Sequence, residues 1–232
     1  TVGDNGTFSI YDGVLADSGA NPLSLVKTGA STQILGGTNS YSGTTTVNGG
    51  LLTINGVIGS GSVSVLGGTL GGDGIITGPL SVNGGSLAPG DRGVGLLTVS
   101  NDVTLASTAT TVMKIDKTAG TNDALRVSGN LTYGGMLTIS NLSAAFAGGD
   151  SFQLFNAASS AGNFAGISGS PGEGLDWKFN PANGVVTVSS TVSTNINASM
   201  ADGVLQISWP ADHLGWRLQV QTNGVGGTWV DW

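Results

Sequence analysis

The chain has 232 residues, 41 of them glycine and 39% of them hydrophobic, so it is long enough to bury a core and is not a typical disordered chain. Only 9% of the residues are charged, the net charge is -7, and the 7 basic residues form no patch, which argues against nucleic acid and an anionic membrane as partners. The absence of cysteine excludes disulfides and thiolate metal sites, and no apolar run reaches the roughly 18 residues that a membrane-spanning helix needs.

Residues 1–24 are predicted to form an N-terminal cap with one clear strand, Thr7–Tyr11. Phe8 and Ile10 alternate there with polar residues, which is typical of a half-buried strand. A coil of stacked strands needs such a cap, because its first strand otherwise has a bare edge. The chain starts without methionine, and we expect a signal peptide to have been removed.

Residues 25–100 consist of short runs of Val, Ile, Leu and Thr that end at Gly or Asn-Gly breaks, and runs of this length favour strands over helices. The first three runs are Gln33–Leu35, Thr44–Val47 and Leu51–Ile54. Glycine pairs recur regularly, since Gly49, Gly67 and Gly84 are 18 and 17 residues apart. This internal repeat predicts a solenoid with one coil per period. Successive coils would pair as parallel strands, with inward Val, Leu and Ile stacked in columns.

Residues 101–145 contain longer candidate strands and the densest group of charges in the chain. Its members are Lys114, Asp116, Lys117, Asp123 and Arg126. We favour the interpretation that the two acids, which flank a Thr-Ala-Gly-Thr-Asn turn, satisfy turn amides while the charges solvate an outer face. In the alternative, the two acids and the arginine act as acid, base and substrate clamp of a β-helix enzyme that cleaves acidic polysaccharides.

Residues 146–190 hold most of the phenylalanines, which is typical of a cap that closes a repeat body, so the body with this cap is predicted over 25–190. Residues 191–232 contain two alternating runs, Val204–Ser208 and Arg217–Gln221, and are predicted to form a small antiparallel β module. Four tryptophans lie in this module: Trp209, Trp216, Trp229 and Trp232.

His213 is the single histidine, so one chain cannot build a histidine-based metal site or triad, and we interpret it as a turn residue. Asp73 lies in a Gly-Gly-Asp-Gly sequence that is superficially similar to calcium-binding nonapeptide repeats. That site needs the aspartate in every repeat, and the sequence has one copy. We therefore predict no catalytic residue, no cofactor and no metal site.

Residues 25–56, LVKTGASTQILGGTNSYSGTTTVNGGLLTING, resemble the autotransporter-associated β-strand repeat, also called the passenger-associated transport repeat. The matching features include Lys27 with Gly29, then Leu35, Asn39, Tyr41-Ser42-Gly43, Thr45-Thr46-Val47, Gly49-Gly50 and Leu52. Weaker similarity extends the resemblance to roughly residue 190. It implies an all-β, right-handed parallel β-helix in a surface-exposed or secreted bacterial protein. Residues 196–232 resemble a terminal segment that follows such repeats in large secreted proteins of Planctomycetes and Verrucomicrobia-type bacteria.

The first functional hypothesis is a non-enzymatic extracellular structural protein, the subunit of a bacterial surface fibre assembled head to tail through β-strand contacts with other copies. The interaction candidates are Phe8, Ile10, Trp209, Trp216, Trp229 and Trp232. The alternative is an autotransporter-passenger-like adhesin in which residues 191–232 bind a surface glycan or another partner. The second alternative is the polysaccharide-active enzyme. All three hypotheses place the protein at the bacterial surface or outside the cell.

Overall fold

The computed structural model describes residues 1–2, 6–191, 197–201, 204–208, 219–220 and 230–231. The chain divides into two units, Thr1–Ser189 and Ser190–Trp232. All regular structure in the described ranges is β-strand, which confirms the all-β prediction. The same ranges contain no helix long and apolar enough to cross a membrane.

The first sheet of Thr1–Ser189 is built from strands that lie one coil apart in the sequence. Its order is β1 (Ser9–Tyr11), β3 (Thr32–Leu35), β5 (Leu51–Ile54), β8 (Thr69–Gly72), β11 (Ser86–Pro89), β14 (Thr110–Asp116), β17 (Met136–Asn141) and β20 (Gly166–Ser168). All neighbours in this order are parallel. A short strand, β15 (Thr121–Asn122), pairs antiparallel with β14 and forms a hairpin at the sheet margin.

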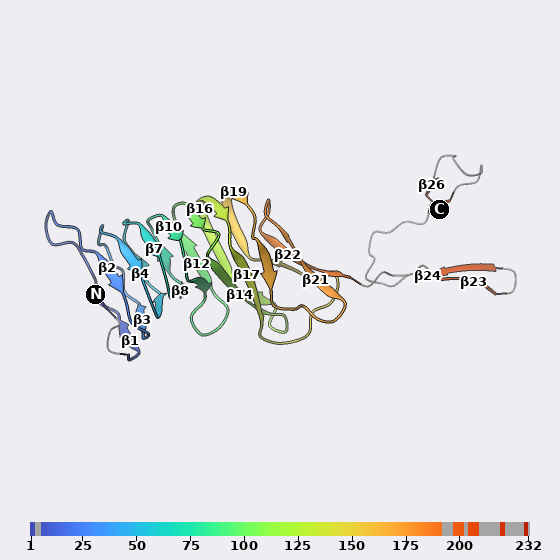
Figure 1. Ribbon diagram of the computed structural model, residues 1–232, viewed down its shortest axis with the longest axis horizontal. Coiled ribbons are helices and arrows are strands. Elements are labelled where there is room, and N and C mark those ends of the chain that lie inside the picture. Colours follow the sequence, from blue (N-terminus) through green and yellow to red (C-terminus); the bar gives the residue numbers. More distant parts are fainter. Residues whose placement is uncertain (3–5, 192–196, 202–203, 209–218, 221–229, 232) are drawn as a thin grey trace. The chain divides into compact units, whose positions relative to one another are not determined.

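The second sheet has two rows of short parallel strands that merge. One row is β2 (Leu25–Lys27), β4 (Thr45–Val47), β7 (Val63–Val65), β10 (Leu80–Val82) and β13 (Val103–Leu105), and the other is β6 (Val57–Ile58), β9 (Ile75–Ile76) and β12 (Leu96–Val99). Both rows pair with β16 (Ala124–Tyr133), which then pairs with β19 (Phe155–Gly162). Each coil thus contributes to both sheets, and Figure 1 shows the coils stacked along one axis, which confirms the predicted parallel β-helix.

The register agrees with the predicted coil length. Val47, Val65 and Val82 are direct neighbours in the second sheet and are 18 and 17 residues apart. Later coils are longer, because the partner of Ser86 is Thr110 and the partner of Thr110 is Met136, offsets of 24 and 26 residues. The additional residues form the loop after β11 and the β14–β15 hairpin.

The core consists of columns of inward side chains, as the repeat predicted. Leu52, Leu70 and Leu87 are neighbours in consecutive coils and have no exposed surface. Each fully buried leucine contributes about 1.5–3 kcal/mol to folding, so the stack of coils rather than any single coil stabilises the unit. The next position of this column is a threonine, Thr111, and the one after it is Leu137.

Glycine is required at one corner that recurs in each coil. Gly50, Gly68 and Gly85 have φ values of 64°, 67° and 64°, in the left-handed region that favours glycine. A Cβ atom on Gly68 would lie 2.5 Å from the carbonyl oxygen of Gly50 in the preceding coil, so the coils approach closely at this corner. The Asn-Gly-Gly and Leu-Gly-Gly signals of the repeat therefore have a steric cause.

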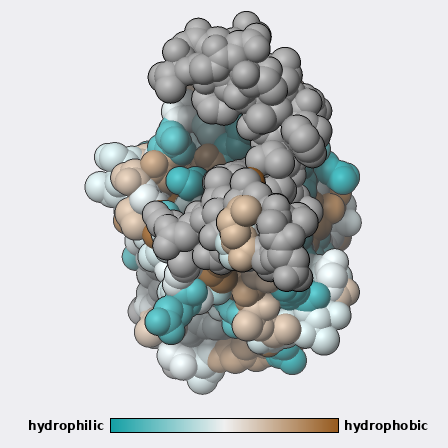
Figure 2. All heavy atoms as spheres, turned by 90° about the vertical axis from the view of Figure 1, so that its right-hand side faces the viewer, coloured by the Kyte–Doolittle hydropathy of each residue, from teal (hydrophilic) through white to brown (hydrophobic). Residues whose placement is uncertain are grey.

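Aromatic side chains close the C-terminal end of this unit. The sheet β18 (Ser151–Gln153), β22 (Val185–Ser190) and β21 (Leu175–Asn180) lies there, and the backbone N–H groups of Leu154 and Phe155 each donate to the carbonyl of Gly184 over 3.1 Å. The ring of Phe155 lies 5.3 Å from Tyr133 and 5.7 Å from Phe179. Figure 2 faces this end and shows hydrophilic and hydrophobic residues interspersed over the coloured part of the surface.

The described part of Ser190–Trp232 consists of two antiparallel pairs. β23 (Asn197–Ala201) pairs with β24 (Val204–Ser208), and β25 (Gln219–Val220) pairs with β26 (Val230–Asp231). The predicted strand Val204–Ser208 has the observed bounds of β24. Antiparallel pairing in this region agrees with the predicted fold class.

Candidate functional site

The N-terminal end of the β-helix leaves one strand edge unpaired. β1 pairs with β3, and no other described strand pairs with its second edge. Phe8 and Ile10, the two candidates from the sequence, are 52% and 54% exposed there. The alternating pattern suggested that these side chains lie on the buried face, but the inner position belongs to Ser9, whose hydroxyl donates to Oε1 of Gln33 over 2.6 Å.

A hollow opens at the same end, where the inner columns begin. Its cavity volume is about 330 Å³. The lining residues are Thr1, Val2, Tyr11, Leu15, Leu23, Ser24, Leu25, Gln33 and Leu35. Leu25 and Leu35 belong to the hydrophobic core, so the core reaches the surface at this end. An apolar hollow beside an unpaired strand edge is a place where another strand can pair and bury apolar surface.

The loop after β11 reaches back toward β1. The guanidinium carbon of Arg92 lies 5.8 Å from the ring centroid of Phe8, a cation–π distance. Nδ2 of Asn55 donates to Oδ2 of the adjacent Asp91 over 3.1 Å. The contact with Arg92 joins Phe8 of the first coil to the loop after β11, and the hydrogen bond of Asp91 joins the same loop to the corner after β5 (Leu51–Ile54).

The other predicted interaction residues lie outside the described residues. These are Trp209, Trp216, Trp229 and Trp232, and His213 lies outside them as well. Their role in assembly or ligand binding stays a prediction.

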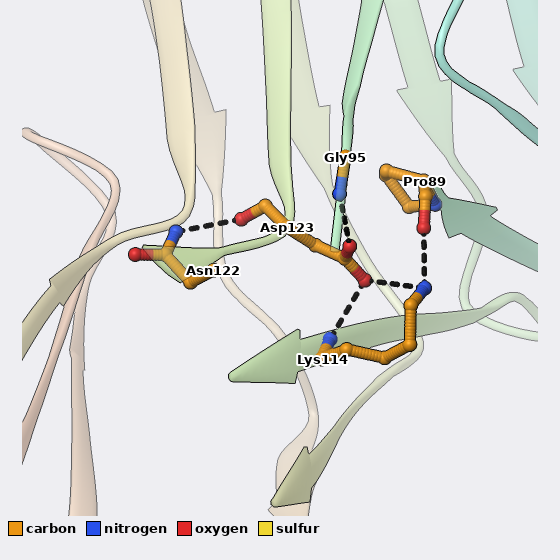
Figure 3. Close-up of polar contacts among 5 residues, drawn as sticks. All are labelled: Pro89, Gly95, Lys114, Asn122 and Asp123. Carbon is orange, nitrogen blue, oxygen red and sulfur yellow. Dashed lines mark hydrogen bonds and ion pairs between the residues drawn. The ribbon is translucent and has the colours of Figure 1, made fainter. Parts of the chain in front are cut away.

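The charge group singled out in the sequence contains one buried site, centred on Asp123. This carboxylate has no exposed surface and accepts hydrogen bonds from the backbone N–H of Gly95 to Oδ1 (2.8 Å) and of Lys114 to Oδ2 (2.7 Å). The Lys114 ammonium lies 2.7 Å from Oδ2 and donates to the carbonyl of Pro89 over 2.5 Å, as Figure 3 shows. Burial raises the pKa of the Asp123 carboxyl, and the hydrogen bond and charge of Lys114 oppose that rise.

Asp73, predicted as an isolated turn residue, belongs to the surroundings of the same site. An ideal Cβ on Gly95 would lie 1.6 Å from Oδ1 of Asp73, so this carboxylate rests against the residue that donates to Asp123. Partial burial and the neighbouring Asp91 charge raise the pKa of Asp73, while Lys114 lowers it. This arrangement could not be predicted from the local pattern, because Asp73 and Asp123 are two coils apart.

Two further members of the charge group, Asp116 and Lys117, have other partners. Asp116 accepts a hydrogen bond from the Ala119 N–H over 2.9 Å within the turn, and this bond, followed by one from Ser143, lowers its pKa. Lys117 forms an ion pair with Asp150 over 2.6 Å, and both side chains are partly exposed. Asp116 and Asp123 therefore have different environments, one solvated and one enclosed by backbone.

Lys27 is a second buried charged residue, and it is one of the features that residues 25–56 share with the passenger-associated transport repeat. It has no exposed surface. Its Nζ donates to the carbonyls of Thr28, Gly29 and Gly49 over 2.7, 3.2 and 3.1 Å. Burial lowers its pKa. The lysine thus connects two successive coils at the glycine corner, which gives this position of the repeat a structural role.

The fold places Thr1–Ser189 in the class of parallel β-helices, and its first coils carry a known sequence repeat. Residues 25–54 match the family described as Passenger-associated-transport-repeat, which confirms the resemblance seen in the sequence. The described residues do not test the resemblance of the C-terminal segment.

Two curated proteins are similar to parts of the chain. One, from Brucella suis biovar 1 (strain 1330), is named "Adhesin BmaC autotransporter" and is 31% identical over 152 residues, which is 64% of this chain and 4% of that protein. The other, from Serratia marcescens, is named "Extracellular serine protease" and is 41% identical over 90 residues, which is 37% of this chain and 8% of that protein. The chain therefore spans less than a tenth of the length of either relative.

Proposed function

We propose that this chain is a non-enzymatic extracellular structural segment at the bacterial surface, and that copies of it join head to tail into a filament. The supporting observation is the N-terminal end, where β1 has an unpaired edge beside an apolar hollow. Ile10 is exposed on β1, and Phe8 is exposed directly before it. A strand from a second copy would satisfy the backbone groups of that edge. A head-to-tail contact of this kind does not close on itself and builds an open fibre.

The apolar side chains add a modest energy to such a contact. Full burial of an isoleucine or phenylalanine contributes about 1.5–3 kcal/mol, and Phe8 and Ile10 are each about half exposed. Covering the exposed half would contribute roughly 1 kcal/mol for each side chain, in addition to the strand pairing. A charge placed at Ile10 should therefore weaken assembly strongly, because the contact would then have to bury it.

Electron microscopy of the purified chain at neutral pH tests the proposal. We expect filaments from the full chain, and none from a chain without residues 1–12 or from Ile10→Lys. The matched control is Ile75→Lys, since Ile75 is also exposed, at 40%, but lies on β9 in the body of the stack. Filaments that persist in Ile10→Lys, or dispersed full-length chains, would refute assembly through β1.

Dispersed chains would favour the second candidate, a surface adhesin. The similarity to a protein named as an adhesin, over 64% of this chain, supports that candidate. Its binding segment would be residues 191–232, and loss of glycan binding in Trp216→Ala or Trp229→Ala would support it. The polysaccharide-active enzyme is disfavoured, because Asp123 is enclosed by backbone and has no surface open to a substrate.

A further inference from the structure

We propose that the side chains of Lys114 and Asp123 condense to form an intramolecular amide bond that cross-links the β14–β15 hairpin. The proposal is independent of filament assembly. It rests on the position of one amine against one carboxyl group that is fully buried and fixed on both oxygens.

The two reacting groups are already held at short range. Nζ of Lys114 lies 2.7 Å from Oδ2 of Asp123, and a carbon–oxygen bond of about 1.2 Å places Cγ within about 3.9 Å of Nζ. The Pro89 carbonyl orients the amine, and the backbone N–H groups of Gly95 and Lys114 orient the carboxyl. Groups fixed near an attacking geometry react far faster than free ones, since the entropy of bringing them together is already lost on folding.

The surroundings favour the neutral product over the ion pair. Burying a carboxylate away from water costs free energy. The reaction begins with a proton transfer from the Lys114 ammonium to the Asp123 carboxylate, and this transfer removes the cost because both groups become neutral. Residues Gly90 and Gly95 place backbone rather than side chains against the carboxyl, so the site has little room for solvent. The second ion pair of this region, Lys117 with Asp150, is partly exposed on both sides and lacks this enclosure.

The bond-forming step balances without a further reactant. After the proton transfer, the Nζ lone pair attacks Cγ, and the charge that develops on Oδ1 is stabilised by the Gly95 N–H, as in an oxyanion hole. The Cγ–Oδ2 bond then breaks, and Oδ2 leaves as water with two protons, one of them from the amine. We assign the transfer of that second proton to Asp73, whose carboxylate lies against Gly95 at the edge of the site.

The intact mass of the folded, purified full chain tests the bond directly. We expect a mass lower than that of the sequence by one water molecule. Trypsin should then fail to cleave after Lys114 and should release residues 93–117 joined to residues 118–126 through the side-chain amide. A folded chain with the full sequence mass and cleavage after Lys114 would overturn the proposal.

Three variants make the test specific, with circular dichroism used to verify that each retains its strand content. Lys114→Arg keeps a positive charge but cannot form the amide, so its mass should equal that of its sequence. Lys117→Arg changes the exposed ion pair and should still lose one water. Asp73→Asn should slow condensation by about a hundredfold or more, measured as the cross-linked fraction against time after synthesis. An unchanged rate of condensation would show that Asp73 does not transfer a proton in the reaction.

Discussion

Thr111 allows a direct test of how the inner columns are stabilised. It stands in register between Leu87 and Leu137, and it has no exposed surface. Its hydroxyl is the buried side-chain polar atom that lacks a hydrogen-bond partner among the described residues. An unpaired buried hydroxyl costs about 1–3 kcal/mol, and valine has nearly the same shape and the same β-branching. Thr111→Val is therefore expected to raise the free energy of unfolding by about 1–2 kcal/mol.

A matched substitution should have the opposite sign. Thr45 is also an inner-facing threonine, 1% exposed, but its hydroxyl lies 2.6 Å from the hydroxyl of Tyr41. Thr45→Val leaves the tyrosine hydroxyl without this partner and should lower the free energy of unfolding by about 1–3 kcal/mol. Urea unfolding followed by circular dichroism measures both variants, and equal m-values would show that the same surface is exposed. Destabilisation of both by a similar amount would refute the argument, since it would mean that the Thr111 hydroxyl is satisfied.

Three further predictions concern the core and the charged groups. Leu70→Ala, in the middle of a fully buried column, should lower the free energy of unfolding by about 2–5 kcal/mol, measured by the same urea titration. For Lys27, burial lowers the pKa in the folded state below 10.5, so the folded chain binds fewer protons than the unfolded chain between these two pKa values. The free energy of unfolding should therefore rise with pH over that range. A difference in unfolding free energy between wild type and Lys27→Met that stays constant over the range would contradict this prediction. The Ser42 hydroxyl, followed by the Leu23 and Ser42 N–H groups, lowers the pKa of Asp17, so its contribution to stability should be present above pH 3.8 and be lost as the pH falls through the folded pKa. Asp17→Asn should remove that loss, as unfolding titrations below pH 4 would show.

The middle of the β-helix could be predicted from the sequence because its strands and corners are locally encoded. Glycine pairs at Gly49, Gly67 and Gly84 gave the coil length, and the register reproduced it. The longer later coils could not be predicted in the same way. Their additional residues, in the loop after β11 and in the β14–β15 hairpin, interrupt the 17–18-residue period. The local sequence does not indicate which of the following strands pairs with the preceding coil.

The burial of Asp123 could not be predicted from the sequence for a related reason. Asp123 follows a turn in the sequence, which predicts a solvated carboxylate. The structure has such a carboxylate at Asp116, which accepts a hydrogen bond within the turn. Asp123 is buried instead, because the longer coil brings Gly95 and Pro89 from the preceding coil against Lys114 and its partner. Burial of a charge depends on which coils become neighbours, so it follows from the register and not from the local sequence.

The two ends of the first unit differ, and this difference limits how copies can join. The C-terminal end is closed on the second sheet by the aromatic group around Phe155, whereas β20 ends the first sheet with pairing to β17 alone among the described strands. If β1 strands of two copies paired about a two-fold axis, they would lie antiparallel and close a dimer, with no site left for growth. If β1 instead received a strand of the same polarity as β3, each added copy would offer a new β1 edge. Particle length at increasing protein concentration therefore distinguishes the two arrangements, because only the parallel one grows beyond two copies.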